Sequence, residues 1–174
     1  MRIPLYIDLD DTLLDNVAVK ARISSLLHFV GLDPDATPGS FNACKTITGF
    51  YTPKSHLQHL GASDEQIAVF EQSWLQEAPK LQEFLFPSAV QYLESIDCEK
   101  FSPMILTLGD LAYQEYKVVN LGIAHFFDAI HITTQPKYKY LQNLHATKDV
   151  FYVVEDREDC RLEIATAFPN SKLY

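Results

Sequence analysis

The fold of this chain is decided by Asp8-Leu9-Asp10-Asp11-Thr12, which directly follows the short apolar run Ile3–Ile7. Such a run predicts a buried strand. Alternate side chains of a strand share one face, so Asp8 and Asp10 are expected to project into one small space where the strand ends. Two crowded carboxylates repel each other unless a cation or a shared proton relieves them. The pair therefore suits a metal-assisted reaction with one carboxylate as nucleophile and the other as acid–base group.

The composition limits the class of protein. A chain of 174 residues, 47% hydrophobic and 12% aromatic, fits one compact domain or one domain with a modest insertion. The net charge of −9 argues against a nucleic-acid polymer as partner, because such binding needs clustered Lys and Arg. The negative charge does not exclude small phosphorylated substrates, since bound Mg²⁺ and one or two local cations reverse the electrostatic potential inside a site.

Cysteine usage and hydropathy bear on the compartment. Cys44, Cys98 and Cys160 are widely spaced and show no metal-type pairing, which is typical of reduced thiols. No stretch approaches the ~20 apolar residues of a membrane span. The acidic motif follows the first residues too closely for a signal peptide. We therefore expect a cytoplasmic protein with no membrane partner, and the sequence does not indicate the oligomeric state.

Four β-branched or aromatic runs predict strands, and helical patterns separate the last three of them. The runs are Ile3–Leu9, Pro103–Leu108, Ala129–Thr133 and Val150–Val154. This alternation predicts an α/β fold built on a doubly wound parallel sheet with helices on both faces.

Residues 15–85 differ from the rest because they contain no convincing strand and several helical signals. A helical pattern runs from Val17 to Val30, and a capping box at Ser63–Gln66 precedes Phe70 and Trp74. We expect residues 1–14 and 86–174 to form the α/β core and residues 15–85 to form a helical insertion. Phe70 and Trp74 are expected to belong to the core of that insertion.

Further polar residues follow the other predicted strands, at the edge of an open α/β sheet where ligands bind. Phosphoryl transfer needs an in-line nucleophile and neutralised phosphoryl oxygens. Mg²⁺ prefers carboxylate oxygens, and a Thr hydroxyl or Lys ammonium holds phosphate oxygens. The residues in question, in chain order, are Thr107, Lys137, Lys139, Glu155, Asp156 and Asp159.

This ordered set resembles the haloacid dehalogenase (HAD)-like superfamily of phosphohydrolases over most of the chain. The first motif of that family, D-x-D-x-T after an apolar strand, matches Asp8, Asp10 and Thr12. The second, a strand ending in Thr or Ser, matches Thr107. The third is a Lys ahead of a helix, here Lys137 by preference and Lys139 as the alternative. The fourth, an acidic pattern after a strand, begins at Glu155-Asp156.

The resemblance implies a Rossmann-like core with a small helical cap and a covalent mechanism. Asp8 attacks the phosphoryl group, and Asp10 protonates the leaving alcohol and then activates water. Mg²⁺ is held by the Asp8 side chain, the Asp10 backbone carbonyl and Asp156. Thr107 and Lys137 bind the phosphoryl oxygens. Further substrate contacts fall to Leu9, Thr12 and Lys139.

The chain departs from the family pattern in its fourth motif and in its first. Glu155 stands where Gly or Asp is commoner, and Asp159 follows Asp156 by three residues rather than four or five. Whether Glu155 or Asp159 assists the metal therefore stays open. Asp11 stands where Gly is commoner. The histidines have no sequence partners typical of a metal site, so we interpret them as surface or cap residues.

The leading hypothesis is a Mg²⁺-dependent phosphatase acting on a small phosphorylated metabolite or nucleotide. A phosphomutase shares the same core chemistry. A haloacid dehalogenase would lack the acid–base group that Asp10 supplies. A signalling receiver domain would need an acceptor Asp after a strand within the helical region. A scaffold that binds a phosphorylated ligand without turnover is the remaining alternative.

Overall fold

The computed structural model describes residues 2–36, 39–45 and 49–174, and the chain divides into two compact units. The first, here called the core unit, holds Met1–Asp15 and Leu85–Tyr174. The second, here called the helical unit, holds Asn16–Phe84. None of the helices formed by the described residues is long and apolar enough to cross a membrane.

The core unit is built on a parallel five-stranded sheet, which confirms the predicted α/β fold. The strand order is β3-β2-β1-β4-β5, so the acidic motif follows a strand with a neighbour on each side. Tyr6 pairs with Met104 on one side and Val153 on the other. The strands are β1 (Ile3–Ile7), β2 (Phe101–Leu108), β3 (Ala129–Thr133), β4 (Tyr152–Val154) and β5 (Lys172–Leu173).

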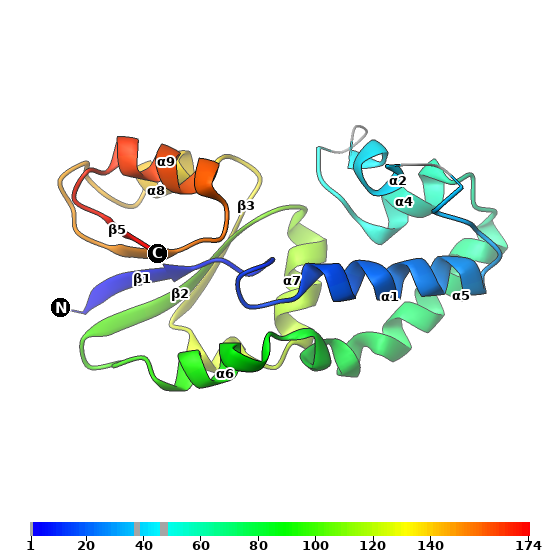
Figure 1. Ribbon diagram of the computed structural model, residues 1–174, viewed down its shortest axis with the longest axis horizontal. Helices are drawn as coiled ribbons and strands as arrows, with labels where there is room; N and C mark the ends of the chain where they lie inside the picture. The colour runs from blue at the N-terminus through cyan, green and yellow to red at the C-terminus, as the bar shows by residue number, and fades with distance from the viewer. Residues whose placement is uncertain (1, 37–38, 46–48) are drawn as a thin grey trace. The chain divides into compact units, whose positions relative to one another are not determined.

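Helices cover both faces of this sheet. In Figure 1, α8 and α9 lie above it and α6 lies below it. The upper face is closed by an apolar cluster: Tyr6, Leu106 and Val153 from the strands, Leu141 from α8, Ile164 from α9, and the neighbouring Phe151 and Phe168. Each such large apolar side chain stabilises the fold by about 1.5–3 kcal/mol when it is buried. The helices are α6 (Pro87–Glu94), α7 (Leu111–Asn120), α8 (Lys137–Gln142) and α9 (Glu158–Ala167), with a short 3-10 helix, η2, at Ala124–Phe126.

Helix α7 begins and ends at recognisable signals, and one of its faces is buried. The side chain of Asp110 accepts a hydrogen bond from the backbone N–H of Tyr113 at 3.0 Å, which satisfies a free donor of the first turn. The helix ends before Gly122, whose φ of 69° suits a residue without a side chain. Between these ends, Gln114 and Lys117 are three residues apart on one buried face.

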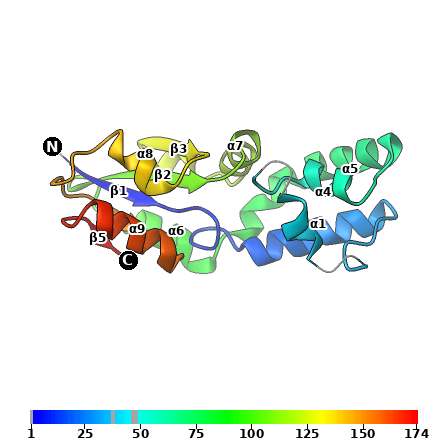
Figure 2. The ribbon, with the colours of Figure 1, turned by 90° about the horizontal axis from the view of Figure 1, so that it is seen from above.

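The helical unit contains the helices predicted for the insertion. They are α1 (Asn16–Phe29), α2 (Ser40–Ala43), α4 (Pro53–His59), α5 (Asp64–Glu77) and the 3-10 helix η1 (Ala78–Phe84). Helices α1 and α5 contact each other and run side by side (Figures 1 and 2). Phe70 and Trp74 of α5 are buried and stacked, with ring centroids 6.4 Å apart, so they belong to the core of this unit as predicted.

The capping box predicted ahead of α5 is present. The Gln66 side chain accepts from the Ser63 backbone N–H at 2.9 Å, and Ser63 Oγ accepts from the Gln66 backbone N–H at 3.3 Å. The same Gln66 amide donates to the Val30 carbonyl at 2.9 Å, just beyond the end of α1. A single residue therefore links the start of α5 to the end of α1.

Candidate active site

The acidic motif lies in a tight turn at the carboxyl end of β1. The Asp8 backbone N–H still bonds to the Val154 carbonyl of β4, and the chain then leaves the sheet. The Leu9 carbonyl accepts from the N–H groups of both Leu13 and Leu14, which closes the turn. The Leu9 side chain is fully buried. The structure thus places the Leu9 side chain in the core, and a part of Leu9 in substrate binding, which its backbone would have to supply, stays a prediction.

Asp8 shares a lysine with Glu155. Lys137 Nζ, at the start of α8, lies 2.6 Å from Asp8 Oδ1 and 2.5 Å from Glu155 Oε2, and all three side chains are buried. Burial raises the pKa of Asp8 to about 7, with Lys137 opposing and Glu155 adding to the shift. Burial alone would lower the pKa of Lys137, but Asp8 and Glu155 more than offset it and the net pKa is raised. The lysine is therefore held in its charged form.

Carboxylates from two strand ends form a group suited to a metal ion. One ligand oxygen from each of Asp8, Glu155 and Asp156 lies within 4.8 Å of the others. These are hard oxygen donors of the kind that Mg²⁺ prefers. Burial raises the pKa of Asp156, and the neighbouring Glu155 charge raises it further, so a cation would relieve repulsion here. The residues present fit a divalent ion.

The loop after β4 holds this group in place. Arg161 of α9 donates through Nη1 to the Asp156 carbonyl at 2.8 Å and also to the Glu155 carbonyl. Asp159 is exposed and forms a double contact with Arg157, at 3.1 Å and 2.5 Å. Glu155 thus lies in the carboxylate group, whereas Asp159 pairs with Arg157. Whether Glu155 assists the metal stays a prediction.

Two threonine hydroxyls near the acidic turn are buried without a hydrogen-bond partner. Among the described residues, neither Thr12 Oγ1 nor Thr107 Oγ1 has one, and Thr107 is only 1% exposed. Buried hydroxyls in native structures are normally bonded. Both hydroxyls thus have spare capacity for a ligand oxygen, as expected for Thr12 and Thr107 from the sequence.

The two candidate lysines of the third motif have different surroundings. Lys137 is buried against Asp8, whereas Lys139 is exposed and its Nζ lies 6.0 Å from the centre of the Tyr138 ring. Such an exposed lysine over an aromatic ring is typical of a solvated surface. The geometry favours Lys137, which was the preferred candidate.

Asp10 has different partners from Asp8. Lys117 Nζ lies 2.6 Å from both carboxylate oxygens of Asp10, and Gln114 Nε2 donates to Asp10 Oδ2 at 2.9 Å. The Asp10 carboxylate is therefore not one of the three that surround the candidate metal position. Its expected metal contact is through the backbone carbonyl, and this stays a prediction. Sequence reasoning missed Lys117 and Gln114, because in the sequence they are ordinary polar positions of a helix.

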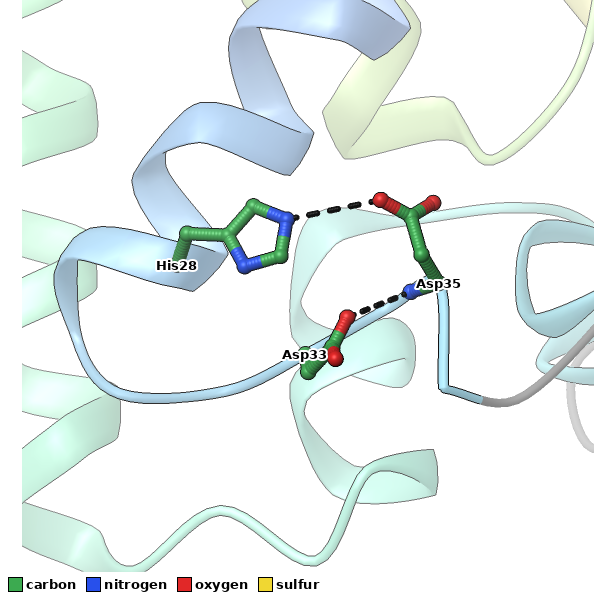
Figure 3. Close-up of side chains that lie close together, drawn as sticks. All are labelled: His28, Asp33 and Asp35. Atoms are coloured by element: carbon green, nitrogen blue, oxygen red, sulfur yellow. Dashed lines mark hydrogen bonds and ion pairs between the residues drawn. The ribbon is translucent and has the colours of Figure 1, made fainter.

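A second group of potential metal ligands lies in the helical unit. His28 Nε2 is 3.5 Å from Asp35 Oδ2, and the Asp35 backbone N–H donates to Asp33 Oδ1 at 2.9 Å (Figure 3). All three residues are exposed, and the Asp33 carboxylate is occupied as the cap of a turn. His28 thus lies on the surface as expected, but His145 does not: its side chain is 12% exposed and packs against Tyr6 and Phe151 of the core unit.

Comparison with known proteins gives matches at the level of structure alone. No protein-family model and no curated protein matches the chain. A putative haloacid dehalogenase-like hydrolase from Burkholderia xenovorans LB400 superposes with a TM-score of 0.74 at 18% identity, over 99% of this chain and 83% of that one.

Two further solved structures have the same fold. The putative HAD-hydrolase YfnB from Bacillus subtilis, bound to magnesium, gives a TM-score of 0.56 at 16% identity, over 94% of this chain and 84% of that one. An L-2-haloacid dehalogenase from Xanthobacter autotrophicus, with chloropropionic acid covalently bound, gives a TM-score of 0.55 at 15% identity, over 97% of this chain and 75% of that one. The chain therefore has the fold of the HAD-like hydrolases, which confirms the predicted resemblance.

Proposed function

We propose that this protein is a Mg²⁺-dependent phosphohydrolase that acts on a small phosphorylated substrate through an aspartyl-phosphate. The observation that carries the proposal is the separation of the two carboxylates of the acidic motif. Asp8 lies with Lys137, Glu155 and Asp156, whereas Asp10 lies with another lysine, Lys117. Different surroundings give neighbouring carboxylates different chemical roles.

In the first step, an oxygen of Asp8 attacks phosphorus and the bond from phosphorus to the leaving oxygen breaks. Asp10 gives its proton to that oxygen, so a neutral alcohol departs. The buried ammonium of Lys137 and the free hydroxyl of Thr107 bind phosphoryl oxygens and offset their negative charge.

In the second step, Asp10 takes a proton from water as the water oxygen attacks phosphorus. The bond from phosphorus to the Asp8 oxygen breaks, which releases phosphate and restores the carboxylate. Asp10 is again protonated and ready for the next cycle. In both halves of the reaction, therefore, Asp8 forms or breaks the bond to phosphorus and Asp10 transfers the proton.

The metal would be held by the Asp8 side chain, Asp156 and the Asp10 backbone carbonyl. When bound there, Mg²⁺ supplies positive charge that stabilises the phosphoryl oxygens. Glu155 contributes differently, because its Oε2 already accepts from Lys137 at 2.5 Å. We assign it the role of holding that lysine against Asp8.

The rival chemistry within this fold is dehalogenation, which one of the structural neighbours performs on a haloacid. That reaction expels a halide, which needs no proton. Asp10, 23% exposed and held by two donors, supplies a proton-transfer group that suits an alcohol leaving group instead. The geometry therefore favours phosphate ester hydrolysis.

Hydrolysis of an aryl phosphate tests the proposal. The native chain and Asp8→Asn are assayed with Mg²⁺ and after treatment with a chelator. We expect turnover that requires both Mg²⁺ and Asp8, and no halide release from 2-chloropropionate. Turnover that survives Asp8→Asn, or no metal-dependent turnover by the native chain, would contradict the proposal. A panel of phosphorylated metabolites would then define the substrate.

A further inference from the structure

Asp10 is held from the protein side by two residues of α7. The Asp10 side chain is 23% exposed, whereas Lys117 is 2% exposed and Gln114 is 3% exposed. The carboxylate thus lies between a buried cation and solvent. This arrangement leaves one side of Asp10 open to a substrate and fixes the other side.

The two Asp10 oxygens differ in how they are occupied. Oδ2 accepts from Lys117 at 2.6 Å and from Gln114 at 2.9 Å. Oδ1 accepts from Lys117 at 2.6 Å. A carboxylate oxygen accepts along two lone-pair directions, so two donors saturate Oδ2 while the Lys117 bond leaves Oδ1 one direction. The contacts therefore select Oδ1 as the oxygen that exchanges a proton.

The position of Gln114 depends on Gly109. A Cβ added at Gly109 would lie 2.5 Å from Gln114 Nε2 and 2.9 Å from Gln114 Cγ, which is closer than real contacts allow. Gln114 Nε2 also donates to the Leu108 carbonyl at 3.2 Å, so the strand end and the acidic turn hold the same amide. The glycine is needed here for close approach and not for an unusual backbone angle.

We propose that Lys117 and Gln114 are positioning residues that orient the Asp10 carboxylate for proton transfer to the leaving group. The proposal rests on the proposed function, because it assigns these residues to the acid–base half of that reaction. Proton transfer needs its donor aligned within hydrogen-bond reach of the leaving oxygen. A purely structural role would explain the buried ion pair of Lys117 and Asp10 poorly, since buried ion pairs often contribute little net stability.

The test uses leaving groups of different basicity. A series from 4-nitrophenyl phosphate to phenyl and methylphenyl phosphate needs increasing protonation of the departing oxygen. We compare the native chain with Lys117→Met, Gln114→Leu and Gly109→Ala. The matched controls are Glu115→Gln, exposed on the same helix, and Lys172→Met, exposed at the edge of the sheet. Thermal unfolding of each variant shows whether it is folded.

We expect Lys117→Met to lose about tenfold in kcat on 4-nitrophenyl phosphate and about 10²–10³-fold on phenyl phosphate, with KM nearly unchanged, because acid catalysis matters more for the poorer leaving group. Gln114→Leu and Gly109→Ala should show smaller losses with the same trend. Both controls should match the native chain. If Lys117→Met does not fold, the other two variants decide the question.

Other results separate this inference from the proposed function. A native chain that hydrolyses the series, with variants that lose the same factor on every ester or lose nothing, overturns the positioning role alone. A native chain with no turnover on any ester overturns the proposed function and the positioning role together.

Discussion

Lys137 Nζ bridges the carboxylates of Asp8 and Glu155, at 2.6 Å and 2.5 Å, and its side chain is only 4% exposed. The lysine comes from the start of α8, and the two carboxylates follow different strands. A single buried ammonium thus ties β1 to β4 at the edge of the sheet where the candidate metal group lies. The contact makes Lys137 part of the stability of the fold as well as part of the site.

Replacing Lys137 by Met should destabilise the protein by about 3–5 kcal/mol, because it leaves two carboxylates buried without their cation. Urea unfolding measures the free energy of unfolding. Lys139→Met, at an exposed position two residues along, should change it by no more than about 0.5 kcal/mol. Equal effects of the two substitutions would contradict the bridging role of Lys137.

Mg²⁺ should raise the unfolding temperature of the native chain. At about 100 times the dissociation constant, a ligand that binds the folded state adds about 2.7 kcal/mol of stability. The increase should disappear in Asp156→Asn and persist in Asp159→Asn, since Asp159 pairs with Arg157 and lies outside the carboxylate group. Loss of the Mg²⁺ effect in both variants, or in neither, would show that the assignment of Asp156 is wrong.

Asp11 has a φ of 62°, in the left-handed region that favours glycine. We expect Asp11→Gly to leave the free energy of unfolding unchanged or to raise it by up to about 1 kcal/mol. Asp11→Val should lower it by at least about 1 kcal/mol, because a β-branched side chain is strained at this φ. Urea unfolding of the native chain, Asp11→Gly and Asp11→Val measures these differences. If Asp11→Val were more stable than the native chain, the left-handed conformation at Asp11 would be refuted.

His56 should make the helical unit sensitive to acid. The ring is buried and neutral: Nε2 lies 3.1 Å from Ser40 Oγ, whose own hydroxyl donates to the Pro34 carbonyl, and Nδ1 lies 3.3 Å from the Tyr51 hydroxyl. Because Ser40 is donating elsewhere, Nε2–H is the donor and Nδ1 the acceptor. Burial, helped by His59, lowers the pKa of His56 to about 4.

The unfolded chain, with a histidine pKa near 6.5, then binds more protons than the folded chain between about pH 6.5 and pH 4. The stability that His56 contributes is full above that window and is lost as the pH falls through it, by about 2–3 kcal/mol. Fluorescence of Trp74, the single tryptophan, reports unfolding of the helical unit. His56→Gln should flatten the dependence on pH, whereas the exposed His125→Gln should keep it. If the stability of His56→Gln depended on pH as steeply as that of the native chain, His56 would not be the source of the acid sensitivity.

The sheet was predictable because its main strands are continuous apolar runs bounded by polar residues. The predicted strands Ile3–Leu9 and Val150–Val154 differ from β1 and β4 only at their ends. The last strand, β5, contains two residues and has no hydrophobic periodicity, so no sequence pattern predicts it. Local periodicity therefore determines which strands are visible in the sequence.

The site was predictable where a residue directly follows a strand, as Asp8 and Asp156 do. Lys117 and Gln114 were missed because they occupy a helix whose pattern shows only ordinary polar positions. Their contacts with Asp10 span 107 and 104 residues of sequence, so packing of α7 onto the sheet determines them. Glu155 was left open for the same reason, since its bond to Lys137 joins the end of β4 to the start of α8.

The most direct test of the account is the capture of the phosphorylated enzyme. The native chain and Asp10→Asn are mixed with a phosphoryl-labelled aryl phosphate and Mg²⁺, quenched rapidly in acid, and digested for mass spectrometry. We predict a phosphoryl group on Asp8, accumulating further in Asp10→Asn because hydrolysis of the intermediate needs the acid–base carboxylate. Turnover of the ester with no label on Asp8, or with the label on another residue, would contradict the account.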